Sequence, residues 1–173
     1  MAARPVVFPP PNWTNQEIVL YHGTLKKHVS AIKAGINVAL GKRFKDFGPG
    51  FYTTTWLPQA QMWAAEIAAT TPGAMPAVIR IKVSREKLAR LDTLAFVRGD
   101  FYADDFWSLV HYCRKGAFDH GRKGRISCYD IVYGPVASLW NEKMIIANAD
   151  QVSFHTTAAE SVLNDPSTKK QVV

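Results

Sequence analysis

The sequence contains Tyr21-His22-Gly23-Thr24 and, further on, Phe47-Gly48-Pro49-Gly50-Phe51-Tyr52-Thr53-Thr54-Thr55. Each segment lies beside or within a run rich in β-branched and aromatic residues, which is typical of a strand. The glycines leave room for another group to approach the backbone closely. These two segments therefore predict two strands whose ends carry polar rings beside open backbone.

The bulk composition predicts a single globular domain. The chain has 173 residues, of which 47% are hydrophobic and 20% charged, and this is ordinary for a soluble protein with one core. No apolar run approaches the roughly 18 residues of a membrane span, so no membrane contact is expected. We predict an extended, proline-rich lead-in at residues 1–16, the domain at residues 17–164, and a polar tail at residues 165–173.

Cysteine content and charge narrow the possible environment and partners. Cys113 and Cys128 lack any metal-binding spacing, so we expect buried free thiols and no metal site. The N-terminal stretch has no apolar signal-peptide core, which predicts a cytoplasmic protein. A net charge of +7 and a pI near 9.5 favour contact with nucleic acid or with an acidic protein. The cations are dispersed along the chain, so both kinds of partner stay open.

Hydrophobic patterning predicts an α+β fold with many short elements. Thr24 is a plausible N-cap for the first helix, and Pro58 suits the first turn of the second. Ser84 is expected to begin a short helical turn. The predicted strands are residues 17–22, 51–55, 77–83, 94–97, 129–136, 144–147 and 151–155, and the predicted helices are residues 24–34, 58–69, 104–114 and 156–163.

Four residues can hold a flat ring that carries an amide, such as the nicotinamide of NAD. The His22 imidazole can hydrogen-bond a ribose hydroxyl, and Gly23 can offer its backbone N–H and C=O to a carboxamide. Tyr52 and Trp63 can cover the two faces of the ring. Each residue also has a plain structural interpretation, since a satisfied strand-end histidine and core aromatics are common in proteins.

Taken together, Tyr21-His22-Gly23-Thr24, Gly48-Pro49-Gly50-Phe51-Tyr52-Thr53-Thr54 and Gln59-Ala60-x-x-Trp63-Ala64 resemble the ADP-ribosyltransferase superfamily. The resemblance is to the diphtheria-toxin and poly(ADP-ribose) polymerase side, whose triad is written H-Y-E. It implies a split antiparallel β-sandwich with inserted helices, with NAD as substrate in the cleft between the sheets. The NAD-binding residues that it implies are His22, Gly23, Tyr52 and Trp63. Thr24 and Arg43 are two further candidates for contact with NAD.

The remainder of the chain is similar to a bacterial and plant branch that is catalogued only as a domain of unknown function. The shared features lie between about residues 18 and 163 and follow one another in the same order. Single motifs of this kind are weak, whereas several in order are more specific. They are Asp46-Phe47-Gly48-x-Gly50-Phe51-Tyr52-x-Thr54, Phe106-Trp107 with Arg114, Tyr129-Asp130-Ile131-Val132-x-Gly134-Pro135-Val136-Ala137, and Asp150-Gln151-Val152-x-Phe154-His155-Thr156.

The third triad position departs from the family pattern, because Gln151 stands where the family has its catalytic glutamate. A neutral amide can bond a ribose hydroxyl but supplies less electrostatic stabilisation than a carboxylate. Gln151 can suffice for transfer of a single ADP-ribose, or Glu142 or Glu160 can supply the carboxylate. The third alternative is a domain that binds NAD without turning it over.

Other polar residues around the glycine loop have less specific interpretations. Asp46 can orient Lys42 or Arg43, contact the target, or simply pair with a neighbouring cation. Lys33, Lys42, Arg43 and Lys45 can meet the pyrophosphate of NAD or a nucleic-acid backbone, although solvated surface charge is the default for each.

The resemblance leads us to expect an NAD-dependent mono-ADP-ribosyltransferase that acts as a toxin or effector. The expected acceptor is RNA, DNA or a protein, and an antitoxin or immunity protein is a possible partner. Such a protein can also be delivered into a host or target cell. Two other classes stay open: a catalytically silent module that binds NAD, ADP-ribose or a partner protein, and a basic nucleic-acid-binding domain.

Overall fold

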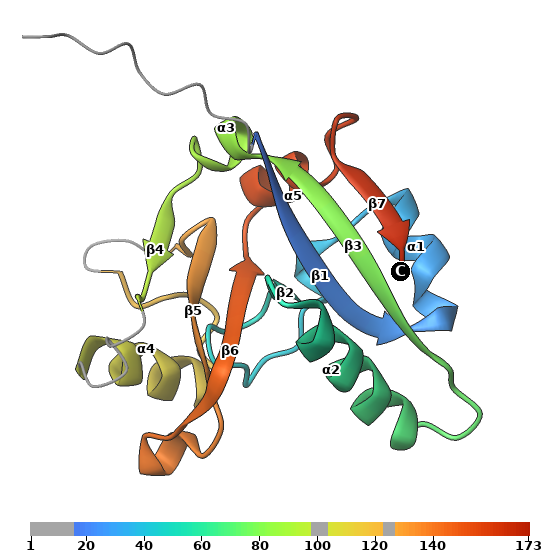
Figure 1. The fold of residues 1–173 in the computed structure, drawn as a ribbon. Helices are drawn as coiled ribbons and strands as arrows, with labels where there is room; N and C mark the ends of the chain where they lie inside the picture. The colour runs from blue at the N-terminus through green and yellow to red at the C-terminus, as the bar shows by residue number, and fades with distance from the viewer. Residues whose placement is uncertain (1–15, 98–103, 123–126) are drawn as a thin grey trace, which may run out of the picture.

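The structure is a computed structural model that describes residues 16–97, 104–122 and 127–173. Almost all of the predicted lead-in, residues 1–15, lies outside the described residues. The described strands form two sheets that stand side by side (Figure 1). The fold is therefore mixed α and β, as the hydrophobic pattern predicts.

The first sheet has three antiparallel strands in the order β1-β3-β7. They are β1 (Glu17–Leu25), β3 (Pro76–Ser84) and β7 (Lys169–Val172). The second sheet has the order β2-β6-β5-β4. Its strands are β2 (Phe51–Thr53), β6 (Ile145–Phe154), β5 (Ile131–Ala137) and β4 (Thr93–Ala95), and only the β4–β5 pair is parallel.

In the part of the chain that the structure describes, one isolated bridge joins the backbones of the two sheets. The Tyr21 N–H donates to the Thr54 carbonyl at 2.8 Å, and the Thr54 N–H donates to the Tyr21 carbonyl at 2.9 Å. Beyond this bridge, the sheets are held together by side-chain packing between β1, β3, β6 and the helices and by a hydrogen bond from the His22 ring to the Tyr52 carbonyl.

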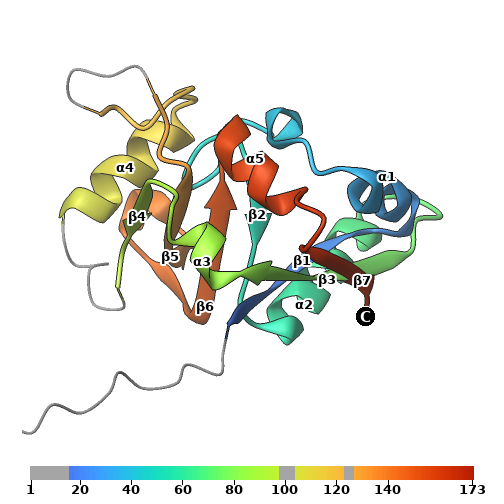
Figure 2. The same ribbon diagram turned by 90° about the horizontal axis from the view of Figure 1, so that it is seen from above.

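Helices cover both faces of the first sheet (Figure 2). Helix α2 (Leu57–Ala69) lies on one face, where its small residues Ala60 and Ala64 pack against Tyr21 and Val78. Helices α1 (Val29–Ala34) and α5 (Thr157–Leu163) lie on the other. Helix α4 (Asp104–Arg114) packs its aromatic face against the second sheet, and the short helix α3 (Arg85–Leu88) follows β3. No described helix has both the length and the apolar character that a membrane crossing requires.

Three elements differ from the sequence-based prediction because strand pairing overrides local preference. β1 continues to Leu25, where Thr24 pairs with Ala77, so Thr24 is not a helix N-cap. A 3₁₀ turn at Lys26–His28 and α1 follow instead. The predicted polar tail contains β7, which pairs with β3. The two strands predicted at residues 144–147 and 151–155 are one strand, β6.

Candidate functional site

The edge of β1 exposes the backbone of Gly23 on the side away from β3. In an antiparallel strand the N–H and C=O groups of alternate residues point to opposite sides. Tyr21 uses its N–H and C=O to bridge Thr54, so those of Gly23 point to the same side of β1, toward β2. Within the described residues neither Gly23 group has a hydrogen-bond partner, although Gly23 is buried.

Helix α2 explains why position 23 is a glycine. A Cβ at Gly23 would lie 2.3 Å from the Ala60 carbonyl oxygen and 3.1 Å from the Ala64 nitrogen. The sequence predicts that this glycine leaves room for another group, and in the structure the group that occupies this space is the backbone of α2. The small side chains of Ala60 and Ala64 therefore bring α2 down onto β1, and a ligand could reach Gly23 only along the strand edge.

His22 is fixed by one ring nitrogen and leaves the other available. Its Nδ1 lies 2.7 Å from the Tyr52 carbonyl oxygen, which can only accept, so Nδ1 carries the proton. The ring stacks on Phe51 at 4.3 Å between centroids. Burial lowers the pKa of His22, although the Tyr52 carbonyl opposes this effect. The ring is thus neutral near pH 7, and its Nε2 is a hydrogen-bond acceptor with no partner among the described residues.

Tyr52 and Trp63 occupy different environments. The Tyr52 hydroxyl donates to the Gly48 carbonyl at 2.7 Å and accepts from the Phe47 N–H at 3.1 Å, so it pins the glycine loop. Burial raises the pKa of Tyr52 well above its usual value. Trp63 on α2 is 50% exposed, and the Lys45 ammonium lies 5.1 Å from its ring centroid. Trp63 is therefore the aromatic residue of the pair that is open to a ligand.

Two histidines, His120, which is buried, and His155, which is half-buried, hold the same loop against the second sheet. The His155 Nδ1–H donates to the Pro49 carbonyl at 2.7 Å, and the His120 Nε2–H donates to the Phe47 carbonyl at 3.0 Å. Burial lowers the pKa of His155 to about 3 and also lowers the pKa of His120. Both rings are thus neutral near pH 7 and fix the loop through these hydrogen bonds.

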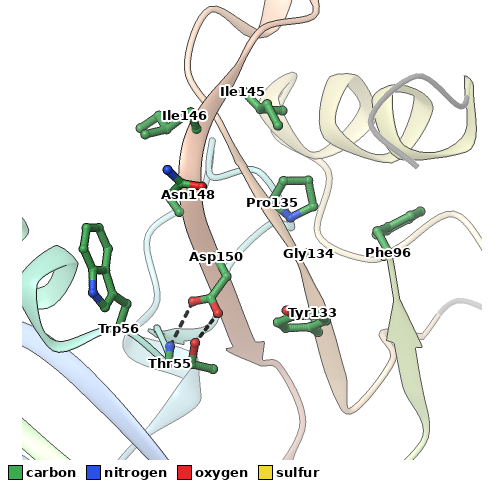
Figure 3. Close-up of a pocket in the computed structure, with 12 residues that line it drawn as sticks. Thr55, Trp56, Phe96, Tyr133, Gly134, Pro135, Ile145, Ile146, Asn148 and Asp150 are labelled. Atoms are coloured by element: carbon green, nitrogen blue, oxygen red, sulfur yellow. Dashed lines mark hydrogen bonds between the residues drawn. The ribbon is translucent and has the colours of Figure 1, made fainter. Parts of the chain in front are cut away.

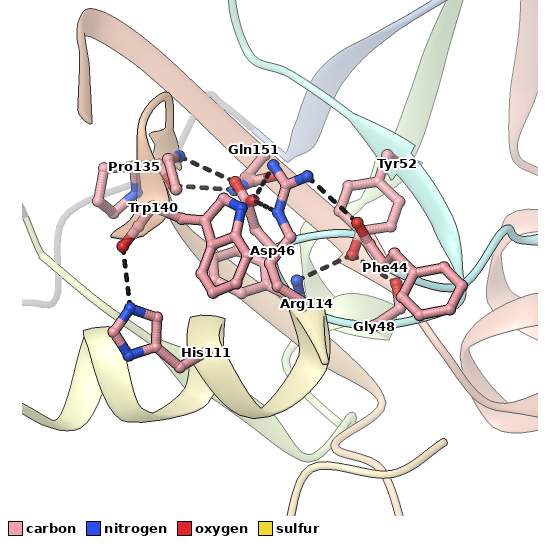
Figure 4. Close-up of polar contacts among 11 residues, drawn as sticks. Phe44, Asp46, Gly48, Tyr52, His111, Arg114, Pro135, Trp140 and Gln151 are labelled. Atoms are coloured by element: carbon pink, nitrogen blue, oxygen red, sulfur yellow. Dashed lines mark hydrogen bonds and ion pairs between the residues drawn. The ribbon is translucent and has the colours of Figure 1, made fainter. Parts of the chain in front are cut away.

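A buried carboxylate, Asp46, organises the residues around Gln151 (Figure 4). Asp46 is 3% exposed. Its Oδ1 accepts from the Arg114 guanidinium at 2.6 and 2.8 Å. Its Oδ2 accepts from the Gln151 Nε2 at 2.7 Å and from the Ala137 N–H at 2.8 Å. One of the three predicted roles of Asp46 was to orient Lys42 or Arg43, and the structure does not show it: the carboxylate pairs with Arg114 instead. The sequence alone did not reveal this role of Arg114.

Gln151 lies on the opposite side of the second sheet from the His22 ring. It shares a face of β6 with Ser153, which pairs with Tyr52, whereas His22 stacks on Phe51, the neighbour of Tyr52 in β2. The Gln151 amide nitrogen also donates to the Pro135 carbonyl at 2.9 Å. The structure therefore brings His22 to the Tyr52 backbone, and it does not bring Gln151 to His22.

The remaining predicted site residues are dispersed. Glu142 is exposed in a 3₁₀ turn after β5, and Glu160 accepts from the Val38 N–H through its carboxylate at 2.9 Å. Thr24 is buried in β1, and its backbone pairs with β3. Arg43 lies on the surface and donates to the Gly116 carbonyl at 3.1 Å.

A groove of about 850 Å³ runs along β5 and β6 (Figure 3). Its walls include Trp56, Tyr133 and Ile146, and Asp150 points from β6 toward Thr55. The Asp150 carboxylate accepts from the Thr55 N–H at 2.9 Å and also from the Thr55 hydroxyl. The sequence motif contained Asp150 but did not single it out, because only the folded strand shows that its carboxylate faces a groove.

The described residues contain no cluster of three or more histidine, cysteine, aspartate or glutamate side chains that could hold a metal ion. Both cysteines are free thiols; Cys113 is buried, whereas Cys128 is only half-buried. Burial raises the pKa of Cys113 to about 12, which makes it an inert thiol at neutral pH.

Comparison with known proteins gives one match. A family model described as "Protein of unknown function (DUF3990)" matches residues 18–142. No curated protein and no solved structure matches the chain. The match covers β1 through the turn that holds Glu142, and thus includes His22, Gly23, the glycine loop, Trp63 and Arg114. The chain therefore belongs to the DUF3990 family.

Proposed function

We propose that the protein binds NAD beside the free edge of β1 and uses it as an ADP-ribose donor. The observation that carries this proposal is the pair of unpartnered backbone groups on Gly23. A buried N–H and C=O without partners are costly, and together they match the C=O and NH₂ of a carboxamide. The resemblance to ADP-ribosyltransferases supports the same assignment.

Two neighbouring side chains suit the rest of the donor. The free Nε2 of neutral His22 can accept a hydrogen bond from a ribose hydroxyl. The exposed indole of Trp63 on α2 offers a flat apolar face for the nicotinamide ring. Lys45, which lies above that indole, can approach a pyrophosphate oxygen. The Tyr52 ring serves mainly to fix the glycine loop.

The proposed reaction breaks the bond between the ribose C1′ and the nicotinamide nitrogen. Nicotinamide leaves with the bonding electron pair as a neutral molecule, and positive charge develops on the ribose. A nucleophile of the acceptor then attacks C1′ and loses its proton to solvent or to a base. The acceptor is a nucleic acid or a protein, and a toxin or effector role with a cognate antitoxin or immunity protein follows the resemblance.

A catalytically silent NAD-binding module is the second candidate, and the surroundings of Gln151 favour it. Its amide nitrogen is held by Asp46 and by the Pro135 carbonyl, on the sheet face opposite His22. Glu142, the other candidate for the third position, is exposed and has no hydrogen-bond partner for its carboxylate within the described residues. Weak transition-state stabilisation follows if no carboxylate approaches the ribose.

One experiment separates these functions. Purified protein is incubated with NAD alone and with RNA, DNA or lysate protein, and free nicotinamide and acceptor mass are measured. Release with a mass gain of one ADP-ribose on an acceptor supports a transferase, and release without an acceptor indicates NAD hydrolysis. Thermal stabilisation by NAD without release indicates the binding module. If NAD causes neither nicotinamide release nor thermal stabilisation, the proposal that the protein binds NAD is refuted.

Matched variants test the site. His22→Asn keeps an amide N–H where Nδ1–H donates to Tyr52, and it removes Nε2; Trp63→Ala removes the exposed ring. Both should weaken NAD binding by at least about fivefold, the effect of losing roughly 1 kcal/mol. Met62→Ala is the control, because Met62 is exposed on the same helix. Equal NAD affinity in all three variants would show that the site is wrong.

A further inference from the structure

Two loops at the C-terminal end of α4 place exposed aromatic rings around one cation. The Arg43 guanidinium carbon lies 3.8 Å from the Phe118 ring centroid and 5.5 Å from that of Phe44. Phe118 is 70% exposed and Phe44 is 57% exposed. Lys42 precedes Arg43 and Lys115 precedes Gly116, and both lysines are exposed. We call Lys42, Arg43, Phe44, Lys115 and Phe118 the Phe44–Phe118 patch.

The backbone around this patch has an unusual conformation that its neighbours hold in place. Phe44 has a φ of 64°, a conformation that is unusual for an aromatic residue. Its carbonyl accepts from the Arg114 Nη1 at 3.2 Å, and Arg114 is itself held by Asp46. A Cβ on Gly116 would lie 2.7 Å from the Phe44 ring. Such strain persists where surrounding structure enforces it, as at ligand-binding sites.

The cations of the patch have no carboxylate partner within residues 16–97, 104–122 and 127–173. Lys42, Arg43 and Lys115 form no ion pair with any described carboxylate. The Asp46 carboxylate is buried and paired with Arg114. Asp119 borders the patch, and its Oδ1 accepts from the Tyr112 hydroxyl at 2.7 Å and from the Gly121 N–H at 2.9 Å. The exposed face therefore combines cations that form no described ion pair with two exposed rings, and Arg43 lies against both of these rings.

We propose that the Phe44–Phe118 patch binds single-stranded nucleic acid. Exposed rings beside cations are the arrangement that such binding uses, because bases stack on the rings while the cations meet phosphates. Cations alone could bind any polyanion. Stacking on Phe44 and Phe118 requires bases whose faces are free, and a single strand offers such faces whereas a duplex does not. The net charge of +7 favours the approach of a polyanion. This proposal concerns binding alone and does not depend on NAD.

The test measures fluorescence anisotropy of labelled oligothymidylate and oligouridylate without NAD. Phe44→Asn suits the left-handed backbone of that position while it removes the ring, and Phe118→Ala removes the other. Each should weaken single-strand binding by at least about fivefold. Leu139→Ala, at an exposed apolar residue outside the patch, should leave the affinity unchanged. Urea midpoints equal to that of the parent protein confirm that the variants fold.

A salt series tests the cations separately. Lys115→Gln should reduce the slope of log affinity against log salt by about 0.7, the value for one phosphate contact on a single strand. Arg90→Gln, which removes an exposed cation after α3, should leave the slope unchanged. Three results would overturn the proposal: no single-strand binding at about 50 mM salt, equal affinity for a duplex or heparin, or unchanged affinity in both aromatic variants.

Discussion

Replacing Asp46 with asparagine removes the charge at the centre of the most connected polar cluster described in the site. The carboxylate accepts from Arg114 on Oδ1 and from the Gln151 Nε2 and the Ala137 N–H on Oδ2. Asparagine has one acceptor oxygen and one NH₂ group. Whichever way the amide turns, its NH₂ therefore faces either the guanidinium or two N–H donors, and no rotamer satisfies all of these partners.

The expected loss follows from the burial of each partner. Breaking a buried ion pair costs about 3–5 kcal/mol, and the side chains of Asp46 and Arg114 are 3% and 27% exposed. Because solvent reaches part of the Arg114 guanidinium, we expect the loss of the ion pair to cost about 3 kcal/mol, the lower end of this range. An unsatisfied buried Ala137 N–H adds about 1 kcal/mol or more. We expect Asp46→Asn to lower the free energy of unfolding by about 3–5 kcal/mol.

Equilibrium unfolding in urea measures this loss. With a slope of about 2 kcal/mol per molar urea, the midpoint should fall by roughly 1.5–2.5 M. Asp46→Asn combined with Arg114→Met should lose less than the sum of the two single variants, because the neutral pair leaves no unpaired cation. Glu86→Gln, at an exposed ion pair with Arg90, is the control and should cost under about 1 kcal/mol. A loss under about 1 kcal/mol for Asp46→Asn would refute the reasoning.

Three further changes have defined outcomes. The pKa of His155 is about 3 in the folded protein and about 6.5 when unfolded, so below pH 6.5 protons bind the unfolded chain preferentially and stability falls. At pH 5 we expect the free energy of unfolding to be about 2 kcal/mol lower than at neutral pH. Urea midpoints should show this loss in the parent protein and not in His155→Gln. Gly23→Ala forces a Cβ to within 2.3 Å of the Ala60 carbonyl and should cost about 1–3 kcal/mol, and a melting temperature equal to the parent's would contradict the close approach of α2. The Gln59 side chain bonds the Asp150 backbone C=O at 2.7 Å and the Asp150 N–H at 3.2 Å. Gln59→Ala removes both partners and should lower the free energy of unfolding, measured by calorimetry, by about 1–3 kcal/mol. An unchanged stability would show that solvent replaces these bonds freely.

Elements with strong local signals were predictable from the sequence. The helix predicted at residues 58–69 is α2 at Leu57–Ala69, with proline in its first turn, and the helix predicted at residues 104–114 is α4. Ser84 does begin a short helix, since its hydroxyl accepts from the Lys87 N–H. In each case the periodicity or the capping residue that determines the element lies within one short window.

Elements that depend on distant partners were not predictable in this way. Thr24 has a good capping side chain, yet it stays extended because β3 pairs with it. The sequence Lys169–Val172 is polar enough to suggest a tail, and becomes a strand only because β3 offers an open edge. Local propensity is weak compared with such tertiary pairing.

The candidate site shows the same division. His22, Gly23 and Trp63 could be named from their residue types and spacing, because the chemistry of a planar amide restricts what can bind it. Asp46 and Arg114 could not be paired in advance, since the residues between them include the three strands β2, β3 and β4 and the two helices α2 and α3. The orientation of Gln151 likewise depends on which face of β6 the glycine loop covers.

The order in which the chain visits its two sheets limits how the protein can be divided. The chain passes from β1 in one sheet to β2 in the other, returns for β3, leaves again for β4, β5 and β6, and comes back for β7. No continuous segment contains one complete sheet without strands of the other. A single proteolytic cut therefore cannot release either sheet as an intact piece. Most stabilising contacts join segments that are far apart in the sequence, so they form only after those segments have come together. Slow, all-or-none folding is the expected behaviour of such an interlaced topology.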